Sequence, residues 1–241
     1  MRLKVDVIYA CSATIAAFAK KATQTIPIVF LSSAEPVSAG LVNSLARPGG
    51  NLTGFATIAA VLAGKRLELL KEAVPKLSRV AILWEPTNQG SQESWKESQP
   101  AARVLGLQIH SMEVTSAAKF ESAFSEAIKA RSNALAVTLS ALFTSQQKRI
   151  LSLAAKHRLP AIYTREEFVE NGGLMSYGAD QDEPFKRIAV MIDKILKGVK
   201  PADIPVEQPA KFEFIVNLQA AKQIGLTIPP NVLARADRLI K

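Results

Sequence analysis

Short apolar runs alternate with segments in which apolar residues recur every three or four positions along most of the chain. The apolar runs predict buried strands at 5–10, 26–31, 52–55, 80–84, 107–114, 134–139, 160–163, 174–177 and 212–216. The recurring segments predict helices at 12–22, 39–46, 67–74, 99–105, 120–128, 144–157, 182–197 and 218–224. Strands that alternate with helices are typical of parallel sheets covered by helices on both faces.

The pattern restarts near residues 75–79, which predicts two α/β lobes with Rossmann-like, doubly wound parallel sheets. We expect the first lobe at 1–77 with a return segment at about 178–205. The second lobe is expected at 78–177 with part of 206–241. The first run contains about three strands and the second about five, so the first lobe is the smaller one.

Charge does not point to nucleic acid, although the formal net charge of the 241 residues is +9. The basic residues fall in separate pairs on different predicted helices: Lys20-Lys21, Lys65-Arg66, Lys148-Arg149 and Lys186-Arg187. We interpret them as solvated helix faces rather than a nucleic-acid stripe. The aromatic content of 6% also argues against a surface for stacked bases. No apolar run approaches the length of a membrane span.

Catalytic and cofactor signals are missing from the sequence. There is no dinucleotide fingerprint, phosphate loop or nucleophile elbow. The two histidines, His110 and His157, lie outside the predicted strand exits, and Cys11 is the single cysteine. We therefore predict no cofactor, no metal and no catalytic residues, with a Rossmann-like enzyme kept as an alternative because fold alone does not exclude one.

Small polar and aromatic residues gather where the predicted strands end. In open α/β sheets, ligands bind outside the carboxyl ends of the strands, so these residues are candidates for a small-molecule site. They are Ser12, Thr14, Ser32, Ser33, Glu35, Thr53, Trp84, Glu85, Ser140, Tyr163, Ser176 and Tyr177. The alternative is that they only cap helices and form turns. Such a set favours binding in a cleft between two lobes, with hinge closure.

Several motifs in order along the chain resemble a known family. They include TIPIVF at 25–30, RPGGNLTGF at 47–55, KRLELLKEAVP at 65–75 and GGLMSYG at 172–178. Together they resemble the TrpX-like family of ABC-transporter substrate-binding proteins. The resemblance implies a type I periplasmic-binding fold, capture of a small molecule for an ABC permease, and a periplasmic or membrane-anchored extracytoplasmic location. An amino acid or another small carboxylate is the expected ligand.

The resemblance also implies roles for single residues. Ser12-Ala13-Thr14 at a helix start would hold an anionic group such as a carboxylate. Glu35 stands where the family usually has an aspartate. Trp84-Glu85-Pro86 and Ser140-Ala141 depart from the family's usual strand exits.

The start of the chain departs from the family, whose full chains begin with a signal or lipoprotein segment and two further β-α units. We expect a fragment, a mis-started reading frame, or a homo-oligomer that pairs through the exposed first-lobe edge strand at 5–9. Without a signal peptide in this sequence, a cytoplasmic ligand-sensing module of the same fold is the second hypothesis. The lack of a DNA-binding segment disfavours it, and a truncated relative that binds nothing is a further alternative.

Overall fold

The computed structural model describes residues 4–180 and 182–241, and the chain divides into two compact units. Unit 1 comprises Met1–Ile58 and Asp180–Lys211, and unit 2 comprises Ala59–Ala179 and Phe212–Lys241. The first boundary therefore follows Ile58 rather than lying near residue 77. The reason is that helix α2 (Ala63–Ala73) buries its apolar face in the core of unit 2.

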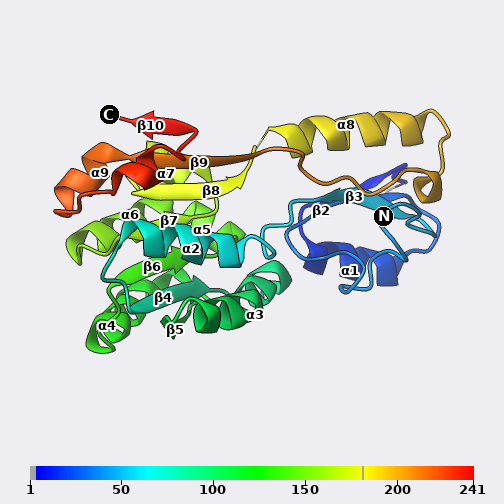
Figure 1. Cartoon of the computed structure of the whole chain (residues 1–241). Coiled ribbons are helices and arrows are strands. Elements are labelled where there is room, and N and C mark those ends of the chain that lie inside the picture. The colour runs from blue at the N-terminus through cyan, green and yellow to red at the C-terminus, as the bar shows by residue number, and fades with distance from the viewer. Residues whose placement is uncertain (1–3, 181) are drawn as a thin grey trace. The chain divides into compact units, whose positions relative to one another are not determined.

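Unit 1 contains a three-stranded parallel sheet in the order β1-β2-β3. Its strands are β1 (Ile8–Ala10), β2 (Ile28–Ser32) and β3 (Leu52–Ala56). Helices α1 (Ala13–Ala22) and α8 (Glu183–Leu196) cover opposite faces of this sheet (Figure 1). Ile28 and Phe30 pack on the α1 side and Val29 on the α8 side. Burial on both faces explains why β2 is a continuous apolar run.

Strand β1 lies at an edge of this sheet. It was expected at 5–10 but forms only over Ile8–Ala10, and among the described residues it hydrogen-bonds to β2 alone. Val5 is 44% exposed and Tyr9 40% exposed. Association of two copies through this edge stays a prediction.

The prediction of a helix at 39–46 is wrong, because this segment forms turns and bends. The Gly40 φ angle is +68°, a left-handed conformation that interrupts any helix there. The Lys20 ammonium donates to the carbonyl oxygens of Gly40 and Leu41 and holds the turn against α1. Leu41 and Val42 are buried although they belong to an irregular loop. The spacing of apolar residues in this segment resembles that of the apolar face of a helix, which explains the wrong prediction.

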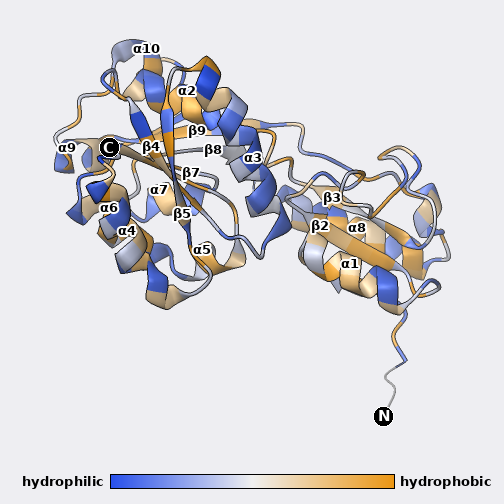
Figure 2. Ribbon diagram, turned by 90° about the horizontal axis from the view of Figure 1, so that it is seen from below, coloured by the Kyte–Doolittle hydropathy of each residue, from blue (hydrophilic) through white to orange (hydrophobic). Residues whose placement is uncertain are grey.

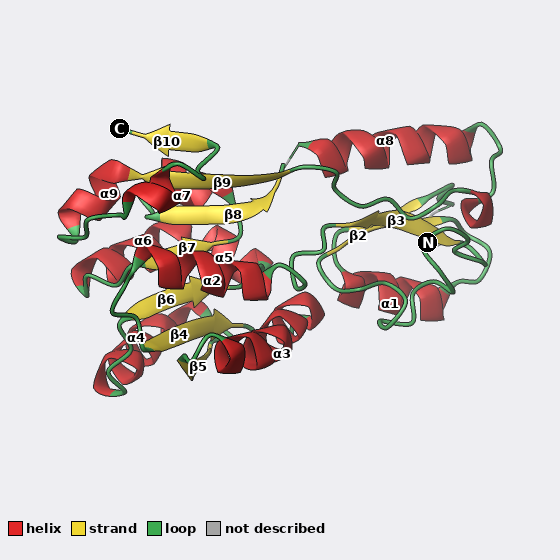
Figure 3. Cartoon of the chain, viewed as in Figure 1, coloured by secondary structure: helices red, strands yellow, loops and turns green. Residues whose placement is uncertain are grey.

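Unit 2 contains a seven-stranded sheet in the order β10-β9-β8-β7-β6-β4-β5 (Figure 3). Its strands are β4 (Arg79–Trp84), β5 (Gln108–Glu113), β6 (Ala134–Val137), β7 (Ala161–Tyr163), β8 (Met175–Ala179), β9 (Phe212–Asn217) and β10 (Arg238–Ile240). All neighbours are parallel except β8 and β9. Strand β8 ends where the chain leaves unit 2 and β9 begins where it returns, so the two run in opposite directions.

Two hydrophobic clusters cover the two faces of the unit 2 sheet. One is formed with α2, α3 (Gln89–Val104), α9 (Leu218–Gln223) and α10 (Pro230–Leu233), and the other with α4 (Phe120–Lys129), α5 (Ala141–Ser145), α6 (Gln147–Lys156) and α7 (Glu166–Glu170). Single-turn 3-10 helices η1 (Ala117–Lys119) and η2 (Pro201–Asp203) complete the elements. Side chains alternate along β4, with Val80 and Ile82 in the first cluster and Ala81 and Leu83 in the second. Figure 2 shows hydrophobic residues concentrated on the strands and the inward faces of the helices.

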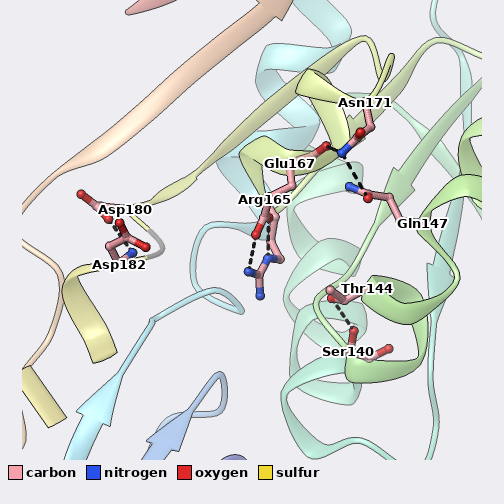
Figure 4. A network of polar contacts seen from close by, with 8 residues as sticks. All are labelled: Ser140, Thr144, Gln147, Arg165, Glu167, Asn171, Asp180 and Asp182. Carbon is pink, nitrogen blue, oxygen red and sulfur yellow. Dashed lines mark hydrogen bonds and ion pairs between the residues drawn. The ribbon is translucent and has the colours of Figure 1, made fainter. Parts of the chain in front are cut away.

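Two predictions about helix ends in unit 2 are wrong. Helix α3 begins at Gln89 rather than Gln99, because its buried face in the first turns consists of Ser91, Ser94 and Ser98 and carries no apolar signal. The helix predicted at 144–157 begins at Gln147, as α6, because Thr144 belongs to the separate short helix α5. The Thr144 hydroxyl donates to the Ser140 carbonyl oxygen, 3.0 Å away within α5 (Figure 4). In the described ranges, no helix is both long and apolar enough to cross a membrane.

Candidate functional site

The carboxyl edge of the unit 1 sheet brings together segments that are distant in the sequence. The parallel register pairs Ala10 with Phe30, so the residues after β1 lie beside the residues that end β2. The Thr57 amide, just after β3, donates to the Ser32 carbonyl oxygen at 2.8 Å. Residues 12–14 and 32–35 therefore both lie at this edge of unit 1, and we call this surface the carboxyl edge.

Helix α1 begins at the carboxyl edge. The Ser12 hydroxyl caps it by accepting a hydrogen bond from the Ile15 amide at 3.2 Å. Ala13 is buried and Thr14 is half-buried in the first turn. A helix N-terminus offers free N–H groups and a positive dipole end, which favours an anion. This arrangement fits a ligand carboxylate, and the role stays a prediction.

Ser32 and Glu35 use their side chains to form turns. The buried Ser32 hydroxyl donates to the Ala34 carbonyl oxygen at 2.8 Å and accepts from the Ala34 amide at 3.1 Å. The Glu35 carboxylate accepts from the Ser38 amide at 2.5 Å. Ser33, between them, is partly exposed. These bonds match the alternative in which the residues shape the edge rather than meet a ligand directly.

Thr53 lies away from the carboxyl edge. It pairs with Val29 in the sheet, three residues before β3 ends, and its side chain is fully buried. Its hydroxyl donates to the Ile204 carbonyl oxygen at 2.7 Å, which ties η2 to the sheet. In this structure Thr53 therefore has a packing role instead of the predicted ligand contact.

Thr57 is an edge residue that the sequence prediction missed. Its Oγ1 atom is buried and has no hydrogen-bond partner in the part of the chain that the structure describes. An unsatisfied buried hydroxyl carries a desolvation cost of about 1–3 kcal/mol. The rule that identified the other candidates, a polar residue directly after a strand, would have found it.

Trp84 and Glu85, at the end of β4, are held in place by contacts within unit 2. The Trp84 ring stacks on Trp95, with centroids 5.5 Å apart, and its Nε1 donates to the Ser111 hydroxyl at 2.7 Å. The Glu85 amide donates to the Ser91 hydroxyl at 2.8 Å. The Trp84 ring is therefore fixed by packing before any ligand arrives.

Ser140, after β6, caps the five-residue helix α5 by accepting from the Phe143 amide at 3.1 Å. Just before it, the hydroxyls of Thr138 and Ser91 lie 2.6 Å apart and link the exits of β6 and β4. Because β4 and β6 are neighbours, Trp84, Glu85 and Ser140 lie at one edge of the unit 2 sheet. Thr138 was not predicted, although it also directly follows a strand.

Tyr163 and Ser176 are part of the unit 2 interior, and Tyr177 is half-buried against it. Tyr163 is 1% exposed and stacks on Phe168 at 4.7 Å within a hydrophobic cluster, so the predicted ligand role does not fit its position. Ser176 is 2% exposed inside β8. The Tyr177 ring packs on the other hydrophobic cluster, and its carbonyl oxygen accepts from Arg66 Nε at 2.8 Å. The rule that candidate residues follow strands located these strands, but it did not predict where their side chains point.

The burial of Tyr163 makes a testable prediction at alkaline pH. Burial raises its pKa above the usual value of 10. The unfolded chain loses this proton near pH 10 while the folded chain retains it, so stability falls as the pH rises above 10. Above pH 10 the free energy of unfolding should fall by about 1.4 kcal/mol per pH unit because of Tyr163. We expect Tyr163→Phe to lack this fall, as measured by urea unfolding at about pH 9 and about pH 11. An equal alkaline loss in both proteins would contradict the assignment.

Arg66 corrects the expectation that every basic pair is a solvated helix face. It is 4% exposed, and its guanidinium donates to the carbonyl oxygens of Tyr177 and Ala59. Arg165, after β7, is a second cation that the sequence prediction missed. It forms a two-point contact with Glu167 at 2.8 and 2.6 Å (Figure 4).

A small pocket lies at the amino ends of β7 and β8, opposite the strand exits. Leu159, Ala161, Gly173 and Leu174 line it together with α6 and α9. It encloses about 20 Å³, which is room for a single water molecule. This pocket is therefore not the predicted ligand site. Within residues 4–180 and 182–241, no group of three or more His, Cys, Asp or Glu side chains is placed to hold a metal ion.

Comparison with known proteins identifies relatives over most of the chain. The model of a family described as "ABC transporter substrate binding protein" matches residues 2–240. A tyrosine-binding protein from Clostridioides difficile strain R20291 is 27% identical over 223 residues, which are 92% of this chain and 64% of the relative. The chain thus spans less than two thirds of the length of that curated relative.

Solved structures agree with the fold. An ABC domain in complex with L-Trp from Streptococcus pneumonia has a TM-score of 0.88 and 27% identity, and the match covers 98% of this chain and 81% of that one. A ligand-free, open substrate-binding protein with adhesive properties from Clostridium difficile has a TM-score of 0.67, also at 27% identity, and the match covers 98% and 78%. The predicted fold class, α/β lobes with parallel sheets of the periplasmic-binding type, is confirmed.

Proposed function

Because the chain belongs to the ABC transporter substrate-binding protein family, we propose that it captures an aromatic amino acid by its α-carboxylate at the carboxyl edge of unit 1. The observation that carries this proposal is the capped N-terminus of α1 at that edge. Its free amides and dipole suit a carboxylate. The ligands in the names of two relatives, tyrosine and L-Trp, support the aromatic class.

We further propose that the protein delivers this ligand to an ABC permease on the extracytoplasmic side of the membrane. Family membership supports this proposal. The family is one of binding proteins, so we propose no reaction and no cofactor. Uptake of the labelled amino acid into vesicles that carry the cognate permease should then depend on added protein.

Calorimetric titration tests the ligand class. L-tyrosine and L-tryptophan should bind, whereas tyramine and tryptamine, which lack the carboxylate, should bind at least about 100-fold more weakly. A ligand present at about 100 times its Kd should also stabilise the fold by about 2.7 kcal/mol. Equal binding of the amines would contradict carboxylate capture. A folded protein that binds neither amino acid would support the alternative of a non-binding relative.

A further inference from the structure

Arg66 is a buried cation that is held by backbone carbonyl groups. It lies in the first turns of α2, and its side chain turns into unit 2. Its Nε donates to the Tyr177 carbonyl oxygen and its Nη1 to the Ala59 carbonyl oxygen, both at 2.8 Å. Across the described ranges, it forms no ion pair with a carboxylate.

Placing this charge inside the protein has a cost. Burial lowers the pKa of Arg66 to about 9, and the group is still protonated at neutral pH. A buried charge is costly unless it is paired and hydrogen-bonded. In this structure the cost of burying the charge is offset by hydrogen bonds to two backbone carbonyl groups. An apolar side chain of similar length would fill the same space without this cost, so packing alone does not explain the guanidinium.

The two carbonyl groups belong to segments that connect the units. Ala59 is the first residue of unit 2 after the first connection, and Tyr177 lies two residues before the second connection. The third connection enters unit 2 at Phe212, which pairs with Ala179 in the β8–β9 ladder. The rings of Phe212 and Tyr177 also pack together, with centroids 6.2 Å apart. One guanidinium thus links the unit 2 ends of all three connections, two directly and one through β8.

The residue next to this cluster is conformationally strained. Ile58 has a φ angle of +47°, which is rare for a β-branched residue. Such a backbone conformation costs about 1–3 kcal/mol and persists only where the surrounding structure enforces it. The Arg66 guanidinium bonds to the carbonyl oxygen of the next residue, Ala59.

We propose that Arg66 is a positioning residue that clamps the unit 2 ends of the three connections into one fixed hinge base. The clamp restricts relative movement of the two units to the residues just outside it. This inference concerns the protein without ligand, so it stands whether or not the proposed ligand class is right.

Hydrogen exchange of the ligand-free protein tests the clamp. Arg66→Met removes both hydrogen bonds, and Arg66→Lys keeps the charge but cannot reproduce the two-point contact. Lys65→Met is the matched control, because it removes a positive charge from the adjacent, surface position on the same helix. We expect exchange at Ala63, whose amide donates to the Ala60 carbonyl oxygen, and at 177–179 in the β8–β9 ladder to rise by at least about tenfold in Arg66→Met, less in Arg66→Lys, and not at all in the control. Amides in β4 and β6 should keep their protection.

Two results would overturn the clamp: unchanged exchange at both places, or a uniform rise across unit 2, which would indicate a role in packing only. If Arg66→Met does not fold, the comparison of Arg66→Lys with Lys65→Met decides. A distance distribution between labels on Cys11 and on Ser125→Cys, an exposed position on α4, gives a second readout. We expect it to broaden in the Arg66 variants and to match the wild type in the control. An unchanged width in the Arg66 variants would also contradict the proposal.

Discussion

Thr14→Asp is expected to weaken ligand binding by about 100-fold or more while the protein stays folded. A factor of 100 corresponds to about 2.7 kcal/mol. The new carboxylate would lie in the first turn of α1, where an acidic side chain stabilises a helix through its dipole. The same carboxylate would compete with a ligand carboxylate for the free amides and repel it. Stability and binding should therefore change in opposite directions.

Thr25→Asp is the matched control for this prediction. Thr25 is an exposed threonine of unit 1, but it lies before β2, at the opposite end of that strand from the carboxyl edge. Calorimetry with L-tryptophan and thermal unfolding should be run on both variants. We expect the control to bind like the wild type. Normal binding by Thr14→Asp would show that the α1 N-terminus does not hold the ligand.

Gly54→Ala is expected to destabilise unit 1 by at least about 3 kcal/mol. Gly54 pairs with Phe30 across β2 and β3. A Cβ atom at Gly54 would lie 2.1 Å from the Phe30 carbonyl oxygen and 2.7 Å from the Phe30 amide nitrogen. Both are backbone atoms of a central strand, so the clash can be relieved only by separating the strands. The carboxyl edge would lose its support, and binding should be lost as well.

Gly40→Ala is the comparison for this change. Gly40 also lies in unit 1 and has a φ angle of +68°, but among the described residues beyond its two chain neighbours no atom lies within 4 Å of an added Cβ. Only the left-handed backbone is penalised, at about 1–2 kcal/mol. Urea unfolding together with hydrogen exchange resolved by segment would assign each loss to a unit. Comparable losses in the two variants would contradict the close-approach explanation.

The sequence predicted most strands because they are buried on both faces. The apolar run at 26–31 became strand β2. The helix α4 was predicted equally well, because apolar residues recur every three or four positions at 120–128. The prediction failed for two segments, in each case for a physical reason. The first turns of α3 bury serines and a glycine, which hydropathy does not detect, and residues 39–46 bury apolar side chains from turns.

The candidate site was predictable only at the level of segments. Parallel strands bring their exits to one edge, and 12–14 and 32–35 follow two neighbouring strands of the unit 1 sheet. The rule that candidate residues follow strands carries no information on side-chain direction, so it did not predict that Tyr163 is a core residue. Arg66 was missed because a charged residue on an amphipathic helix is normally solvated. Only the tertiary structure shows the carbonyl groups that it binds.

Alkylation of Cys11 tests the central claim most directly. Cys11 is the only cysteine, is exposed, and directly precedes the Ser12 cap at the carboxyl edge. Its rate of reaction with a maleimide should be measured with and without saturating L-tryptophan or L-tyrosine. A ligand carboxylate at the α1 N-terminus should slow the reaction by about tenfold or more, by covering the thiol. An unchanged rate, at concentrations where calorimetry shows binding, would place the ligand elsewhere and contradict the proposed site.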